Sequence, residues 1–250
     1  MELALAGLVL APALAVGSFL NVVVARLPEK RSLVRPRSAC LYCGHELAWY
    51  DNVPVVSYVI LRGRCRSCGT RIGVRYLAVE LVTALLVAAC FLRFGLTAEA
   101  FLAAFFCAAL VALSAIDLER RILPDRIVLP SFALVLVAHL ALEPDRAAEW
   151  VAGALGAALF LFLALLAYPA GMGMGDVKLA LLLGAMLGKT VAVGLLIGCM
   201  AALVPAVVLL ARHGMAARKM GIPFGPFLAF GAVVALFAGE RLLDAYLTSF

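Results

Sequence analysis

The stretch Gly171-Met172-Gly173-Met174-Gly175-Asp176-Val177-Lys178 stands between two apolar runs, at 150–168 and 177–187, and it decides how the chain can cross a membrane. The second run holds 11 residues. As a helix it would rise about 16 Å, whereas the hydrocarbon core of a bilayer is about 30 Å thick. Asp176 is therefore predicted to lie below the membrane surface, where an ionisable side chain is costly enough to mark a functional site. The alternative is a polar loop in which Asp176 caps the next helix.

The same stretch has the features of a binding loop for an extended chain. Glycines at alternate positions allow another backbone to approach closely. We predict that Gly173, Gly175 and Lys178 form this substrate-binding loop.

The whole chain has the composition of a polytopic membrane protein. Of its 250 residues 66% are hydrophobic and 14% are charged, and the mean hydropathy is +1.09. This is more apolar surface than a soluble core can bury. The predicted fold class is all-α, with about eight transmembrane helices and a small cytoplasmic loop domain that resembles a zinc ribbon. The apolar runs place the helices near 3–25, 75–92, 98–116, 127–142, 149–168, 177–188, 191–211 and 223–243.

The basic residues indicate which side faces the cytoplasm. The net charge of +6 would suggest a nucleic-acid partner in a soluble protein, but here the charges follow the predicted topology. With the N-terminus outside, 17 of the 21 Lys and Arg residues, Arg218 and Lys219 among them, fall in four cytoplasmic loops or at the adjoining helix ends. The positive-inside rule therefore predicts a multi-pass protein with both termini on the outer side, and lipid rather than nucleic acid as its surroundings. The first apolar run is predicted to be a retained helix and not a signal peptide.

The largest predicted cytoplasmic loop, 26–74, carries two Cys-x-x-Cys pairs, each followed by glycine: Cys40, Cys43 and Gly44, then Cys65, Cys68 and Gly69. Four thiolates provide a tetrahedral site for Zn²⁺, and each pair with its glycine can wrap tightly around one side of the metal. A loop of this size has little core of its own, so the metal would supply folding energy. Disulfides are the competing interpretation, but a cytoplasmic loop is kept reduced. Reversible redox pairs remain as a further alternative.

The segment between the two cysteine pairs, 49–61, has two interpretations. It contains a turn at Asp51-Asn52-Val53-Pro54. The apolar residues after this turn are too few to span a membrane. The segment is either a strand of a zinc ribbon or a segment at the membrane interface, where Trp49, Tyr50 and Tyr58 would be stable.

Several carboxylates lie at or inside the predicted spans. Glu80 lies one to two turns inside the second span, and a structural pair with Arg75 or another helix is favoured. Asp117 directly follows the third span, whereas Glu119 and Asp125 have adjacent arginines and are predicted to be solvated. For these last three carboxylates the alternative is that all are membrane-boundary charges.

Asp117 and Asp176 are predicted on the same cytoplasmic side of the membrane. Two carboxylates brought together share a proton and give one acid and one base around a water molecule. This is the equipment for hydrolysing a peptide bond without a covalent intermediate. The helix ends predict that Asp117, beside exposed carbonyls, carries the proton and that Asp176, beside unpaired N–H groups, is the base.

Taken in order, the motifs of this chain resemble those of the type IV prepilin peptidases, or leader peptidases, which belong with the Gly-x-Gly-Asp intramembrane aspartyl proteases. The resemblance covers nearly the whole chain. Besides the two cysteine pairs, it rests on residues 17–22, 26–28, 51–54, 62–66, 75–76, 79–81, 116–118, 123–125, 171–179 and 222–227.

The resemblance implies that Asp117 and Asp176 are the catalytic pair of an enzyme of the bacterial inner membrane. The substrates would be prepilins or pseudopilins of a type IV pilus or type II secretion system, cleaved after a short basic leader. It also implies that the members with the cysteine-bearing cytoplasmic loop methylate the new N-terminus with S-adenosylmethionine, by residues that no glycine pattern identifies. Three parts are expected: a first helix at 1–25, the zinc loop with its four cysteines at 26–74 and a peptidase domain at 75–250.

The alternative from another functional class is a zinc-regulated membrane transporter. In it Asp117, Asp176 and Glu80 would form an ion or proton path. The chain shows no internal symmetry of the kind that such transporters have.

Overall fold

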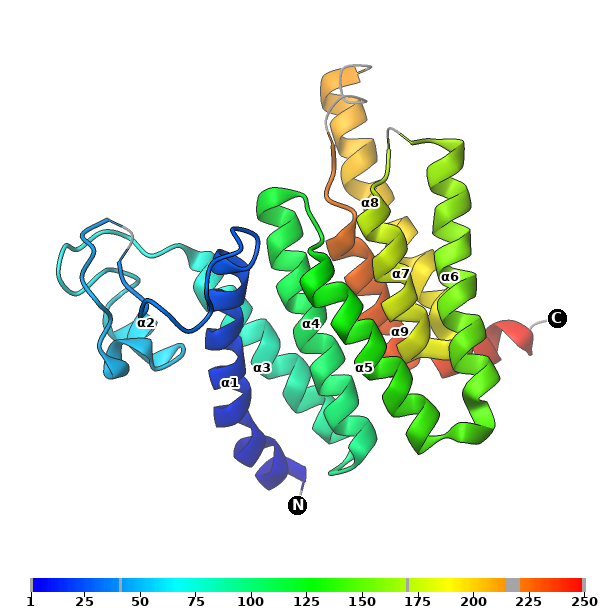
Figure 1. Ribbon diagram of the computed structural model, residues 1–250, viewed down its shortest axis with the longest axis horizontal. Coiled ribbons are helices and arrows are strands. Elements are labelled where there is room, and N and C mark those ends of the chain that lie inside the picture. The colour runs from blue at the N-terminus through cyan, green and yellow to red at the C-terminus, as the bar shows by residue number, and fades with distance from the viewer. Residues whose placement is uncertain (1, 41, 170, 215–220, 249–250) are drawn as a thin grey trace. The chain divides into compact units, whose positions relative to one another are not determined.

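The computed structural model describes residues 2–40, 42–169, 171–214 and 221–248, so that Arg218 and Lys219 lie outside the described residues. Within these ranges the long elements are all helices (Figure 1). They are α1 (Glu2–Arg26), α3 (Val74–Phe94), α4 (Ala98–Arg120), α5 (Asp125–Leu142), α6 (Ala147–Ala167), α7 (Met174–Leu187), α8 (Val191–His213) and α9 (Gly225–Leu247).

These helices agree with the predicted spans to within a few residues. In the described part of the chain, seven stretches are long and apolar enough to cross a membrane. One of them, Met174–Arg212, is 39 residues long and contains both α7 and α8. The predicted all-α polytopic fold is confirmed.

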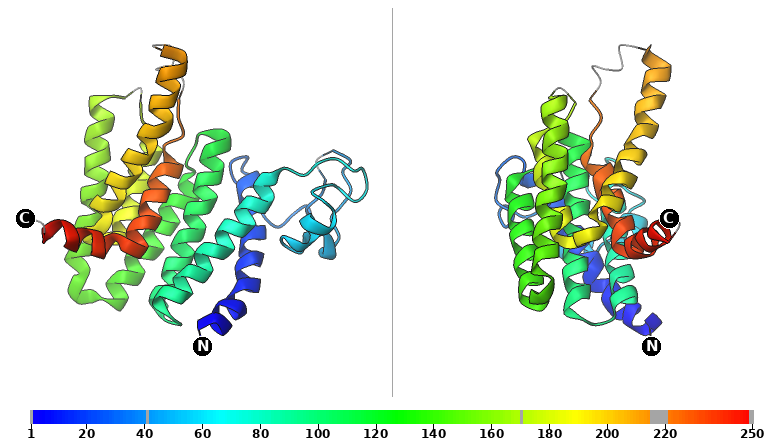
Figure 2. Two further views of the ribbon diagram at one scale, coloured as in Figure 1. Left: turned by 180° about the vertical axis from the view of Figure 1, so that it is seen from behind. Right: turned by 90° about the vertical axis from the view of Figure 1, so that its right-hand side faces the viewer.

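The chain divides into two units, residues 1–115 and 116–250, and α4 runs from the first into the second. In the first unit α1 and α3 pack side by side (Figures 1 and 2). Gly17 permits this approach, because a Cβ atom there would lie 2.7 Å from the Cα atom of Glu80. The amide of Asn21 adds a hydrogen bond from Nδ2 to the carbonyl oxygen of Tyr76, at 3.0 Å.

The cysteine loop lies between α1 and α3 in the sequence and holds only short elements. These are a 3-10 helix, η1 (Trp49–Asn52), and a single helical turn, α2 (Val56–Ile60). Segment 49–61 thus consists of two short helical elements joined by a turn, and its interpretation as a strand was wrong. The extended pairing described in this loop consists of isolated bridges at the two cysteine pairs, Ala39 with Glu46 and Arg64 with Arg71.

In the second unit α7 is the central helix. It contacts α5, α6 and α9 (Figure 2), and ten of its 14 residues are buried. The helix ends at Gly188, which has a φ of 53° that favours glycine. A 3-10 turn, η3 (Gly188–Thr190), then leads into α8. Asp176, the third residue of α7, is buried, whereas Met174 at its start is 49% exposed.

Glycines bring α6 and α7 into close contact. A Cβ atom on Gly184 of α7 would lie 2.5 Å from the Cα atom of Ala154 and closer still to the carbonyl oxygen of Gly153. In contrast, a Cβ atom on Gly156 of α6 would meet no atom within 4 Å. Backbone packing therefore requires glycine at position 184 but not at position 156.

We predict that Gly184→Ala destabilises the protein by about 1–3 kcal/mol, because the added methyl group must push α6 and α7 apart. The matched control Gly156→Ala should be neutral or slightly stabilising, since alanine is the better helix former. Thermal unfolding of both variants in detergent measures the difference. Equal transition midpoints for the two variants would contradict this account of the contact.

Candidate functional site

Asp176 is the third residue of α7 and is 8% exposed. Its Oδ2 accepts a hydrogen bond from the backbone N–H of Gly173 at 3.2 Å, while its own N–H donates to the carbonyl oxygen of Gly173 at 3.1 Å. The carboxylate therefore does bond to the backbone at the helix start, although from inside the first turn and not as the residue that precedes it. Asp176 is therefore the group that satisfies the N–H of Gly173.

Asp117 lies in the last turn of α4 and is 5% exposed. Its Oδ2 accepts a hydrogen bond of 3.0 Å from the backbone N–H of Gly225, the first residue of α9. From the sequence, Asp117 was expected beside the exposed carbonyls of a helix end. In the structure it also has a backbone N–H donor. Each aspartate has one backbone N–H donor at the start of a helix, so the helix ends do not separate the two. Which carboxylate carries the proton stays a prediction.

The two aspartates are held at the same end of the second unit. Leu123, in the connection between α4 and α5, packs against both helix starts: Cβ atoms on Gly175 and Gly225 would lie 3.1 and 3.3 Å from its side chain. Asp117 and Asp176 are close enough for the charge of one to act on the other. The structure thus brings together two buried carboxylates that are 59 positions apart in the sequence. A water molecule between such a pair can be activated for attack on a carbonyl carbon.

Lys178, one of the predicted substrate-loop residues, forms an ion pair that the sequence did not reveal. Its Nζ donates to both carboxylate oxygens of Asp125, each at 2.8 Å. The side chain of Asp125 is 53% exposed. Asp125 is thus exposed as predicted. Its carboxylate, at the start of α5, is nevertheless paired with Lys178 of α7.

Gly225 is the site residue that sequence reasoning missed. It lies within the motif at 222–227, where Gly225 is followed by Pro226 at the start of a long apolar run. Proline near the first helical position indicates a helix N-terminus, and a helix N-terminus offers unpaired N–H donors. The motif could therefore have been interpreted as a donor to a carboxylate, but not as a donor to Asp117 in particular.

Glu80 of α3, in the first unit, has a backbone partner. Its Oε2 accepts a hydrogen bond of 2.8 Å from the N–H of Val55, the residue that precedes α2. Val55 has a φ of 61°, which is rare for a β-branched residue. Surrounding contacts must hold such a conformation, and the bond to Glu80 is one of them. The structural role predicted for Glu80 is supported, with the cysteine loop as its partner.

The two cysteine pairs form one candidate metal centre. The Sγ atoms of Cys40, Cys43, Cys65 and Cys68 lie within 4.8 Å of one another, and Cys40 Sγ is 3.8 Å from Cys68 Sγ. Tetrahedral zinc with Zn–S bonds of about 2.3 Å requires sulfur atoms roughly 3.8 Å apart. The donor set therefore fits Zn²⁺. All four are free thiols and not disulfides.

Both pairs use the same turn to present their sulfur atoms. In the first, the N–H of Gly44 donates to the carbonyl oxygen of Cys40 at 2.9 Å; in the second, the N–H of Gly69 donates to that of Cys65 at 2.9 Å. The two glycines have φ values of 71° and 69°. Matching turns, each with a glycine in the left-handed region, confirm the prediction that the chain wraps tightly at each pair.

The surroundings of Cys68 favour its thiolate form. The Thr70 side chain hydrogen-bonds to it, with Sγ and Oγ1 3.3 Å apart, and together with the Thr70 backbone N–H it lowers the pKa of Cys68 to about 6. The thiolate is the form of cysteine that binds metal.

Two family models match the chain. Residues 12–94 match the bacterial peptidase A24 N-terminal domain, and residues 104–207 match the type IV leader peptidase family. Together the two matches include both cysteine pairs and both aspartates.

Curated relatives are similar over most of the chain, and three of them are named prepilin leader peptidase/N-methyltransferase. The protein of Burkholderia pseudomallei (strain 1026b) is 40% identical, over 90% of this chain and 83% of its own length. That of Bacillus subtilis (strain 168) is 36% identical over 94% of both chains. That of Pseudomonas aeruginosa (strain PAO1) is 37% identical over 94% of this chain and 90% of its own. No solved structure gives a significant match.

We predict that replacing Cys40 and Cys43 with serine removes the bound zinc, because two of four ligands are lost. The loop should then become more sensitive to added protease, since the metal supplies its folding energy. Elemental analysis measures the first effect and limited proteolysis the second. Cys199→Ser, in α8, is the matched control and should retain about one zinc ion per chain. Wild-type protein purified without chelator and containing no zinc would contradict the assignment.

Proposed function

The chain belongs to the type IV leader peptidase family, and on this premise we propose that it cleaves the leader from prepilins or pseudopilins and methylates the new N-terminus. It is a multi-pass inner-membrane protein. The observation that carries the peptidase assignment is the pair of buried aspartates, each hydrogen-bonded to a backbone N–H, at one end of the second unit.

Asp117 and Asp176 are the proposed catalytic pair. One carboxylate, as base, takes a proton from water, and the hydroxide attacks the carbonyl carbon of the scissile peptide bond. The other, protonated, donates its proton to the carbonyl oxygen. Collapse of the tetrahedral intermediate then breaks the C–N bond, and the leaving amine takes up a proton. The coupled pair has titration steps that belong to both groups together.

Gly173 and Gly175 form the proposed substrate-binding loop. The peptide must be extended at the bond that is cut, and glycines allow its backbone to approach the start of α7. Lys178 stands one turn further along the same helix. Its Nζ contacts both oxygens of the exposed Asp125 carboxylate.

The orientation that we propose places both termini in the periplasm and the cysteine loop in the cytoplasm. It rests on the distribution of Lys and Arg. A basic leader is retained on that side by the same rule. We propose three working parts: the first helix at 1–25, the zinc loop at 26–74, held by Cys40, Cys43, Cys65 and Cys68, and the peptidase domain at 75–250.

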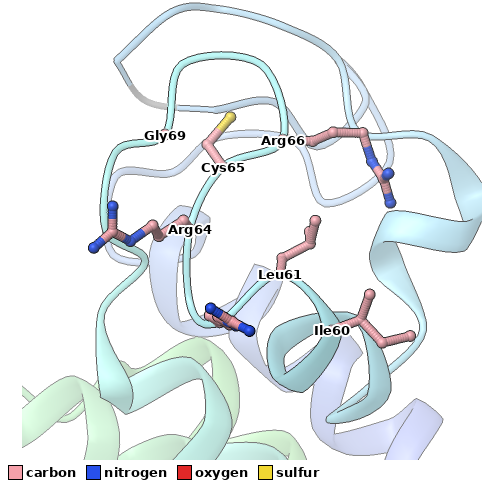
Figure 3. A pocket seen from close by; sticks show the side chains of 7 residues that line it. Ile60, Leu61, Arg64, Cys65, Arg66 and Gly69 are labelled. Atoms are coloured by element: carbon pink, nitrogen blue, oxygen red, sulfur yellow. The ribbon is translucent and has the colours of Figure 1, made fainter.

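S-adenosylmethionine, when bound, supplies the methyl group for the second activity. One described pocket, in the cysteine loop, is lined by Arg62, Arg64 and Arg66 together with apolar residues (Figure 3). One of these guanidinium groups, that of Arg66, is paired with Asp51. We assign no residue to the binding of the cofactor.

A zinc-regulated transporter gains no support from the relatives, whose names describe a peptidase and a methyltransferase. Glu80, which that hypothesis needs as a free carboxylate on an ion path, accepts a hydrogen bond from Val55.

We predict that Asp117→Asn and Asp176→Asn each reduce leader cleavage by about 10²–10⁴-fold, because either change removes a proton donor or acceptor from the reaction. Asp125→Asn is the control and should change the rate by less than about fivefold, since an exposed ion pair contributes up to about 1 kcal/mol. The loss of leader mass from a purified prepilin in detergent is the measurement. An inactive Asp125→Asn beside an active Asp117→Asn would show that the wrong partner had been chosen.

The two activities should separate in the cysteine loop. We predict that the protein in which serine replaces Cys40 and Cys43 still cuts the prepilin but does not methylate it, because the loop and not the aspartate pair supports methyl transfer. Mass spectrometry of the product N-terminus distinguishes the cut from the methylated form. Equal loss of both activities would mean that the loop supports the whole fold instead.

A further inference from the structure

The single turn α2 exposes an apolar face. Val56, Val59 and Ile60 have exposed fractions of 52%, 64% and 69%. Their spacing of three and four residues places them on one side of the helix. Three exposed aliphatic side chains in a row are unfavourable in water, so this face is expected to contact an apolar phase.

The position of α2 beside α3 indicates which apolar phase its exposed face can contact. The N–H of Val55, at the start of α2, is bound to Glu80. Glu80 is six residues beyond Val74, where α3 begins, which is about 9 Å along the helix axis. Since α3 is a candidate span, α2 lies at the depth of the interface and not beyond the end of the span. Figures 1 and 2 agree, with α2 level with the C-terminal half of α1.

The neighbours of α2 have the composition of a membrane interface. Trp49 and Tyr50 of η1, which contacts α2, are 83% and 49% exposed. Amphipathic rings of this kind are enriched where headgroups meet hydrocarbon. The guanidinium group of Arg66 lies over the Tyr50 ring and forms an ion pair with Asp51, at 2.7 Å. Aromatic rings and a cation are thus combined beside the apolar face.

The net charge of the cysteine loop indicates which lipid headgroups it would bind. Between positions 27 and 73 the chain has eight basic and three acidic residues. Arg62 and Arg64 follow α2 directly and are exposed, and Figure 3 shows Arg64 and Arg66 on either side of the pocket above Ile60. This charge repels a basic leader peptide and attracts anionic lipid. Nucleic acid would match the charge but not the apolar face.

We propose that α2 is an interfacial membrane segment that docks the cysteine loop on the bilayer surface. Val56, Val59 and Ile60 enter the boundary between headgroups and acyl chains, and Arg62 and Arg64 bind anionic headgroups. Glu80 sets the depth by holding the start of α2 against α3. The second activity then takes place on a loop fixed at the membrane surface, where the cleaved product lies.

The test is photo-crosslinking of the full chain in nanodiscs of equal parts phosphatidylcholine and phosphatidylglycerol. Val59 is replaced by p-benzoylphenylalanine, and Tyr42, which is 78% exposed in the first cysteine pair, is replaced in the matched control. Mass spectrometry identifies each adduct. The expected result is a lipid adduct at position 59 and not at 42, with phosphatidylglycerol favoured about fivefold, the factor for one arginine near an anionic surface.

A double variant separates charge from depth. Arg62→Gln with Arg64→Gln should lower the ratio of phosphatidylglycerol to phosphatidylcholine adducts at position 59 while the total yield remains. Adducts at 59 only to other parts of the protein, or lipid adducts no more frequent than at 42, would overturn the proposal. A ratio close to one in the protein with both arginines would overturn the role of anionic lipid. An unchanged thermal midpoint shows that each variant is folded.

Discussion

A carboxylate inside a membrane protein needs hydrogen-bond donors, and in this chain the backbone supplies them at helix ends. Asp176 and Asp117 accept from the N–H groups of Gly173 and Gly225. One donor, Gly173, precedes α7, which has only 14 residues, and the other, Gly225, is the first residue of α9, which has 23. Both aspartates are buried, at 8% and 5% exposed. The two-aspartate site is therefore built from the starts of two helices, one short and one of full length.

The first unit applies the same rule for a different purpose. Glu80 also accepts from a backbone N–H, that of Val55, but this donor lies in a loop and not at the start of a long helix. The bond helps to hold Val55 in its backbone conformation with positive φ, and it fixes the loop to α3. A buried carboxylate thus serves as an anchor in one unit, and a pair of them is the proposed reaction centre in the other. The second unit differs from the first because its buried carboxylate has another carboxylate close enough to interact with it.

The sequence predicted most of the features that depend on hydrophobicity and on local chemistry. Apolar runs located the long helices of the described residues, and the Cys-x-x-Cys-Gly spacing indicated the tight turns that the hydrogen bonds of Gly44 and Gly69 confirm. It did not predict contacts between distant segments. The hydrogen bond from Gly225 to Asp117 joins residues 108 positions apart, and neither motif indicates that it contacts the other. For segment 49–61 periodicity could not decide, because a single turn of helix is as short as a strand.

The donors at the aspartate pair are main-chain atoms, and this affects how the site can change during evolution. A side-chain donor is lost by one nucleotide change, whereas a backbone N–H is kept by every residue type except proline. At position 225 a second restriction applies, since a Cβ atom would lie 2.8 Å from Asp117 Oδ2. At position 173 space is not restrictive, because a Cβ atom there would lie 3.8 Å from Asp176 Oδ2. The donor to Asp176 should thus tolerate every substitution except proline, whereas the donor to Asp117 lies at a position that also needs glycine for space.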